Sequence, residues 1–266
     1  MVSRMTLVLN EIHLADGLAR TVMVAAADRR ITRPDGTYYG NYPKLWPIHR
    51  FNGAVSFFGL AVFKNHQNRE CRLWEWLPTF LLKQSSVSGL GELAHNLRDA
   101  LQQWIPRSVL ERNASGFHIC GYNDQFLPEY WFLTNIRQMN GFMPSEIKAT
   151  YKAPAPIFLE DDARTLGWDG QNLRFKPKAS GKLYRNGDFR AHAIAAHLLD
   201  TILEELFKFP DFRKPRTPAE YKQYVLFKFK FIASLYKKWA VHQIVGEPID
   251  IRVWSADVDK SRILSH

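Results

Sequence analysis

The sequence predicts an α+β fold in which two stacked sheets lie between two layers of helices, a four-layer α/β/β/α sandwich. The main observation is the order of the segments: β-hairpins, two helices, further hairpins, two helices and a last strand. The length of 266 residues and the hydrophobic share of 46% allow a large core. No internal repeat or low-complexity tract divides the chain, so we expect residues 1–266 to form a single domain.

The N-terminal part predicts the first sheet. Residues 6–14 alternate imperfectly between apolar and polar side chains, and residues 21–27 are almost wholly apolar. The turn signal Ala15-Asp16-Gly17 between them indicates a β-hairpin. Two further strands, over residues 43–49 and 53–60, are expected to complete this sheet.

The next two segments are expected to form helices. Residues 72–83 are apolar at helical spacing, although Pro78 should kink that helix. Residues 88–113 predict a longer amphipathic helix. Its apolar face carries Leu90, Leu93, Leu97, Leu101 and Trp104.

The second half of the chain continues with strands and then helices. Short strands and loops are expected over residues 141–187, between Pro, Gly and Asp residues. The other expected elements are strands over 116–122 and 130–136, helices over 188–208 and 219–241, and a last strand over 248–254.

The composition narrows the class of protein. Two cysteines, Cys71 and Cys120, form neither a disulfide framework nor a zinc site, so a cytoplasmic protein is expected. No apolar run approaches the roughly 20 residues that cross a bilayer, so no membrane partner is expected. The formal net charge of +10 suits acidic partners or substrates. The basic residues are scattered and no nucleic-acid-binding motif is visible, which argues against nucleic acid.

A charged cluster ends the apolar segment 22–27. Asp28-Arg29-Arg30 follows it directly, and Lys44 comes sixteen residues after Asp28, at the start of the next apolar segment. If these segments are neighbours in the fold, the carboxylate and the ammonium come together. Because most ion pairs are structural, the pair alone indicates either a stabilising contact or a functional site.

These residues resemble the start of proteasome β-subunits, which are N-terminal-nucleophile hydrolases: the sequence AADRR around Asp28, then Lys44, then the turn at Gly59. A second match, to a later hairpin of that family, comprises Gly116, Ile119, Cys120, Gly121 and Asp124. The resemblance implies the same four-layer fold. It also implies that Asp28 orients Lys44, that Lys44 activates the nucleophile, and that Gly59, displaced by one residue, donates its backbone N–H to an oxyanion.

The nucleophile that the resemblance implies is an N-terminal Thr whose α-amino group, with a pKa near 8, is the general base. Processing or a downstream start would expose it, and the candidates are Ser3 and Thr6. With Thr6 as the nucleophile, the hairpin up to Asp28 is longer than the family's by an even number of residues, which keeps the pairing register. With Ser3 the difference is odd, so a bulge would be needed. Thr6 is preferred. If translation starts at Met5, removal of Met5 exposes Thr6. The alternative is that Thr6 merely opens a strand.

Two supporting positions of the family are changed. Its Gly-Ser loop before the third helix has only loose counterparts here, Ser180-Gly181 and Asn186-Gly187-Asp188. Its Asp-x-x-Ser pair before the last strand is replaced by His242 and Val245 when the chain is aligned on Gly246. Val245 has no hydroxyl, so an altered or lost activity is an open alternative.

The leading hypothesis is a threonine-type peptidase or amidohydrolase. Its catalytic residues would be Thr6, Asp28, Lys44 and Gly59. The resemblance implies a peptide or protein substrate, with an unfoldase as a possible partner, and homo-oligomeric rings whose helical layers face each other. The apolar helices over 72–104 would supply that contact or belong to the core.

Two other hypotheses remain. The first is a non-catalytic structural subunit on the same fold, in which Asp28 and Lys44 are a buried ion pair. The second is a basic nucleic-acid-associated protein. No motif suggests a cofactor or a metal: His192 and His197 stand five residues apart, which does not place both on one helix face.

Overall fold

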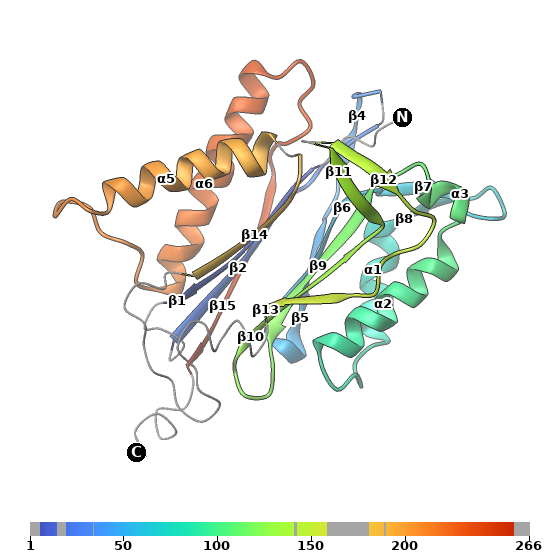
Figure 1. The fold of residues 1–266 in the computed structure, drawn as a ribbon, viewed down its shortest axis with the longest axis horizontal. Helices are drawn as coiled ribbons and strands as arrows, with labels where there is room; N and C mark the ends of the chain where they lie inside the picture. The colour runs from blue at the N-terminus through green and yellow to red at the C-terminus, as the bar shows by residue number, and fades with distance from the viewer. Residues whose placement is uncertain are drawn as a thin grey trace.

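The computed structural model describes residues 6–14, 20–33, 35–140, 143–158, 181–188 and 190–257 of the chain. These residues form a mixed α+β protein, as predicted, with two large sheets. Figure 1 shows the strands of both sheets in the middle, with helices on either side of them.

The first sheet consists, in spatial order, of β14 (Gly181–Gly187), β1 (Leu7–Leu14), β2 (Arg20–Asp28) and β15 (Ile249–Asp257). β1 and β2 form the predicted antiparallel hairpin, with Val8 opposite Ala27. Its turn, Ala15-Asp16-Gly17, lies outside the described residues. β15, the predicted last strand, pairs with the other edge of β2, which places β2 inside the sheet.

The second sheet consists, in spatial order, of β13 (Ala155–Phe158), β10 (Pro128–Thr134), β9 (Ser115–Tyr122), β6 (Gly53–Gly59) and β5 (Leu45–Ile48). The prediction that the third and fourth strands complete the first sheet is therefore wrong. β6 pairs with β9 instead, with Phe57 opposite Phe117. Because β6 is buried over nearly its whole length, its sequence has no polar alternation to reveal which sheet it joins.

Short two-stranded ribbons and one 3-10 turn lie outside the two large sheets. Gly36 N–H donates to the Arg33 carbonyl at 2.9 Å in a turn of the Pro-Asp-Gly sequence, whose Pro34 lies outside the described residues. The ribbons are β3 (Arg30–Thr32) with β4 (Tyr38–Asn41), β7 (Val62–Lys64) with β8 (Glu70–Arg72), and β11 (Ile136–Asn140) with β12 (Met143–Ile147); the 3-10 turn is His49–Phe51.

Two helices cover the outer face of the first sheet, α5 (Ala196–Leu206) and α6 (Pro218–Trp239), and both were predicted (Figure 1). A π-helical turn over Arg190–Ala195 leads into α5. A capping box between Thr217 and Glu220 fixes the start of α6. The core beneath these helices includes Leu7, Leu9, Val24, Ala26, Val225, Phe229 and Ile232.

The helices α1 (Leu73–Leu82), α2 (Leu90–Trp104) and α3 (Arg107–Leu110) cover the second sheet. The single helix expected over 88–113 is therefore two helices, because the chain leaves α2 at Ile105 before Pro106. α1 continues on both sides of Pro78. Most apolar side chains of α1 and α2 pack in one cluster with residues of β6 and β9, whereas Leu82 is exposed.

The inner faces of the two sheets pack on each other. Along β1, Leu7 and Leu9 face the helices, whereas Val8 and Ile12 face the second sheet. The residues between the sheets include Met23, Ala25, Ala54, Phe58, Cys120 and Tyr130. In the part of the chain that the structure describes, no helix is long and apolar enough to cross a membrane.

Candidate functional site

Thr6, Asp28 and Lys44 meet where the two sheets come together at one end. Thr6 directly precedes β1, Asp28 is the last residue of β2, and Lys44 directly precedes β5 in the other sheet. Lys44 Nζ lies 3.2 Å from Asp28 Oδ1 and donates a hydrogen bond to Thr6 Oγ1. The carboxylate and the ammonium thus meet between two sheets, and not between paired strands of one sheet.

The Lys44 ammonium has three hydrogen-bond acceptors, which matches its three N–H donors. Besides Thr6 and Asp28, the third acceptor is the carbonyl oxygen of Arg30. Asp28 is held in turn by the backbone N–H of Leu7, which donates to Asp28 Oδ1 at 3.1 Å. These contacts fix the direction of the ammonium beside the Thr6 hydroxyl.

All three side chains are buried, with exposed fractions of 6% for Thr6, 0% for Asp28 and 2% for Lys44. Burial raises the pKa of Asp28 above its usual value, although Lys44 and the Leu7 N–H act in the opposite direction. Burial likewise lowers the pKa of Lys44, against the attraction of Asp28. Because burial disfavours both charges, each charged form depends on its partner.

A cavity of about 270 Å³ adjoins Thr6 and Lys44. Gly59, the fourth predicted residue, lines the same cavity. Its φ is +83°, and a Cβ at this position would lie 2.0 Å from the Ala114 carbonyl oxygen, so a larger residue does not fit without rearrangement. The structure therefore places Thr6, Lys44 and Gly59 in the wall of one cavity, and Asp28 directly behind Lys44.

The loop after β14 holds the backbone of Thr6. Asp188 N–H donates to the Thr6 carbonyl oxygen at 2.7 Å. Gly187 has a φ of +117°, and a Cβ there would lie 1.7 Å from the same oxygen. Of the two loose counterparts of the Gly-Ser loop, Asn186-Gly187-Asp188 thus lies against Thr6, whereas Ser180 lies outside the described residues, as does Ser3.

The Asp188 side chain anchors this loop to the helices. Its carboxylate accepts hydrogen bonds from the Tyr236 hydroxyl of α6, from Arg190 Nη2 at 2.8 Å and from the backbone N–H of Ala191. Burial alone would raise the pKa of Asp188, but Arg190 and Tyr236 hold it below its usual value. The sequence alone left the role of Asp188 open and did not point us to Tyr236. The pattern that could have identified Tyr236 is a polar group at the end of an apolar helix face.

The segment before β15 also reaches the site. Arg30 Nε donates to the Gln243 carbonyl oxygen. His242 is exposed and Val245 is completely buried in the core under α6. The position where the resembled family has a hydroxyl is thus filled by an apolar side chain in this chain.

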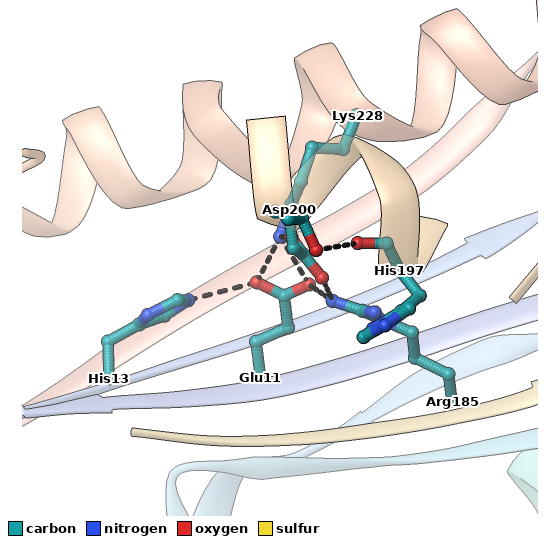
Figure 2. A network of polar contacts seen from close by, with 7 residues as sticks. Glu11, His13, Arg185, His197, Asp200 and Lys228 are labelled. Carbon is teal, nitrogen blue, oxygen red and sulfur yellow. Dashed lines mark hydrogen bonds and ion pairs between the residues drawn. The ribbon is translucent and has the colours of Figure 1, made fainter. Parts of the chain in front are cut away.

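A second charged cluster lies beneath α5 and α6, and sequence reasoning missed it (Figure 2). Glu11 of β1 is fully buried, and its carboxylate accepts hydrogen bonds from Lys228 Nζ at 2.7 and 2.8 Å. Arg185 of β14 also reaches Glu11, at 3.2 Å, and His13 Nε2 lies 3.0 Å from it. Asp200 of α5 accepts from both Lys228, at 2.8 Å, and Arg185.

The charges of this cluster compensate one another. Burial alone would raise the pKa of Glu11, but Lys228, His13 and Arg185 together hold it far below its usual 4.5. Lys228 has an exposed fraction of only 1%, and its ammonium lies 4.3 Å from the centre of the Tyr224 ring. The cluster joins the first sheet to both of its helices.

No group of three or more His, Cys, Asp or Glu side chains in the described ranges is arranged to hold a metal ion. A scan against models of protein families finds none that matches the chain, and a search of curated proteins finds no significant match.

Proposed function

We propose that the protein is an N-terminal-nucleophile amide hydrolase of the kind found in proteasome β-subunits, with Thr6 as the nucleophile. The observation that carries this proposal is the hydrogen bond from a buried, carboxylate-paired Lys44 to the Thr6 hydroxyl at the wall of a cavity. The two sheets with helices outside them are consistent with the four-layer fold of that class.

The proposed reaction needs a free α-amino group on Thr6. That amine takes the hydroxyl proton as Thr6 Oγ1 attacks the carbonyl carbon of a peptide bond. The tetrahedral intermediate then collapses: its C–N bond breaks, the leaving amine receives the proton, and an ester to Thr6 remains. Water hydrolyses this ester and restores the hydroxyl. In a chain that retains Met5, the Thr6 nitrogen is an amide and cannot act as this base.

Lys44 and Gly59 would stabilise charge in this reaction. The Lys44 ammonium lowers the pKa of the neighbouring hydroxyl and favours developing negative charge on Oγ1. Asp28 keeps Lys44 charged and directed, since burial alone disfavours the ammonium. Gly59 would direct its backbone N–H to the oxyanion. We also propose a peptide or protein substrate, and a homo-oligomeric ring that an unfoldase could serve.

Hydrolysis of a fluorogenic peptide amide tests this function. The protein is prepared with Thr6 as its first residue, alongside the variants Thr6→Ala, Lys44→Ala and the exposed control Thr79→Ala. We expect Thr6→Ala to abolish hydrolysis, and Lys44→Ala to reduce kcat by about 100-fold or more, the range for one electrostatic contact at a reacting atom. Thr79→Ala should match the unchanged protein. Hydrolysis that survives in Thr6→Ala would contradict the assignment.

One observation favours a non-catalytic subunit as the second candidate. Val245 is buried where the resembled family has a hydroxyl that supports the amino terminus. In that case Asp28 and Lys44 stabilise the fold only. A folded chain that begins at Thr6 and cleaves no peptide would support this candidate.

A further inference from the structure

We propose that the cavity beside Thr6 takes an acidic side chain, so that the substrate is cleaved after a Glu or Asp residue. This inference rests on the proposed function. The carbonyl attacked by Thr6 Oγ1 belongs to the residue on the acyl side of the cleaved bond. The side chain of that residue is attached one carbon away, so the cavity that Thr6 lines is the space that it would enter.

The wall of this cavity carries more positive than negative groups. Four charged residues line it, namely Arg30, Arg33, Lys44 and Glu70. Which of these charges a substrate would meet depends on how each is already compensated.

Two of the four charges are compensated inside the protein. Lys44 is paired with Asp28, and its three N–H donors are used. Glu70 accepts from Arg72 Nε at 2.9 Å and from the Tyr39 hydroxyl at 3.2 Å. These hydrogen bonds, the one from Arg72 first, lower the pKa of Glu70, so it stays ionised and paired at neutral pH. Lys44 therefore leaves no free donor for a substrate, whereas Glu70 shares Arg72 with Glu75, which accepts from Arg72 Nη1 at 2.9 Å.

Arg30 and Arg33 supply the remaining positive charge. Arg30 donates to the Gln243 carbonyl, and its guanidinium carbon lies 4.6 Å from the centre of the Tyr38 ring. Arg33 lies 5.1 Å from the centre of the Tyr39 ring and bonds neutral oxygens of Thr37 and Tyr38 at 3.4 Å. Within the described residues, neither forms an ion pair of 4.0 Å or less, although Arg33 lies near enough to Asp35 and Glu70 to help lower the pKa of both carboxyls.

The tyrosine contacts orient both guanidinium groups without neutralising them, because a ring attracts a cation but carries no net charge. Much of the remaining wall is apolar, namely Ile31, Phe57, Leu60, Ala61 and Val62, and it also includes the polar residues Thr32 and Asn113. A Glu side chain matches this combination, since its methylene groups fit an apolar wall and its carboxylate fits a guanidinium fork. A Lys or Arg side chain would meet two like charges instead.

Three peptide amides that differ only in the residue before the cleaved bond, Glu, Leu or Lys, test this inference. We expect kcat/KM for the Glu peptide to exceed kcat/KM for the Leu peptide by about two- to fivefold, which corresponds to the upper part of the range for an exposed ion pair. The ratio of the Glu to the Lys peptide should be larger. Arg33→Gln should remove most of this preference through KM, and Arg33→Glu should shift it toward Lys. Arg50→Gln removes an exposed arginine that does not line the cavity, and it should leave the preference unchanged.

The outcomes separate this inference from the function on which it rests. Cleavage that prefers Leu or Lys, or a Glu preference that Arg33→Gln and Arg33→Glu leave intact, would overturn the acidic specificity while the hydrolase assignment stands. If a chain that begins at Thr6 cleaves none of the three peptides, that result would contradict both the proposed function and this inference.

Discussion

The Lys44 ammonium donates a hydrogen bond to the Thr6 hydroxyl, although the two residues precede strands of different sheets. The contact therefore exists only when the two sheets are packed on each other. Asp28 completes it from the end of β2 and is itself held by the first residue of β1. This arrangement links the chemistry of the site to the packing of the whole protein.

Lys44→Ala should lower the stability of the protein as well as its activity. The substitution leaves the Asp28 carboxylate buried without its partner, and such a loss costs about 3–5 kcal/mol. Chemical denaturation of the variant measures the cost. The double variant Lys44→Met/Asp28→Leu removes both charges and should recover much of that stability without recovering activity. A double variant as unstable as Lys44→Ala would contradict the account of the pair.

Gly187→Ala should displace Thr6 and reduce hydrolysis. A Cβ at Gly187 would collide with the Thr6 carbonyl oxygen, and the positive φ of this residue adds strain of about 1–3 kcal/mol. Gly89→Ala is the matched control, since a Cβ there meets no other atom within 4 Å. Peptide hydrolysis and the midpoint of thermal unfolding measure both variants. Equal behaviour of the two would show that the loop does not position Thr6.

Glu11→Gln should destabilise the protein most strongly at neutral pH. Because the folded state lowers the pKa of Glu11 below 4.5, the ionised carboxylate contributes stability above about pH 4.5. That contribution is lost as the pH falls below this value toward the folded pKa. We expect a cost of about 3–5 kcal/mol at pH 7 and a smaller difference from the unchanged protein at pH 4 and below.

Denaturation by urea between pH 3 and pH 7 measures this difference. The control is Glu75→Gln, whose ion pair with Arg72 is exposed and should contribute less than about 1 kcal/mol at any pH. A cost for Glu11→Gln that does not change with pH would mean that the carboxylate acts by its shape and not by its charge.

Local patterns in the sequence predict much of the fold. The N-terminal hairpin, both helices over the first sheet and the last strand follow from apolar periodicity and turn residues, and the structure has them. The sheet to which β6 belongs cannot be predicted from these local patterns. β6 is apolar on both faces, and its partner β9 lies far along the chain, so nothing local distinguishes the two sheets.

The charged residues described for the site were likewise only partly predictable from the sequence. The resemblance to proteasome β-subunits predicts Thr6, Asp28, Lys44 and Gly59, because the residues that carry it lie in one N-terminal stretch. The contact between Glu11 and Lys228 was not predicted, because 217 residues separate them. A signal existed: each is a charged residue on an otherwise apolar face, Glu11 after Leu7 and Leu9, and Lys228 beside Val225 and Ile232. Opposite charges at such positions can be matched only after the elements are known to pack together.

The most direct test of the hydrolase assignment is the intact mass of the protein purified from its native host, with and without a peptide epoxyketone. That electrophile needs both the hydroxyl and the free amine of an N-terminal threonine. The assignment predicts a chain that begins at Thr6 and gains one adduct, with no adduct in Lys44→Ala. A chain that retains Met5 and takes no adduct would contradict it.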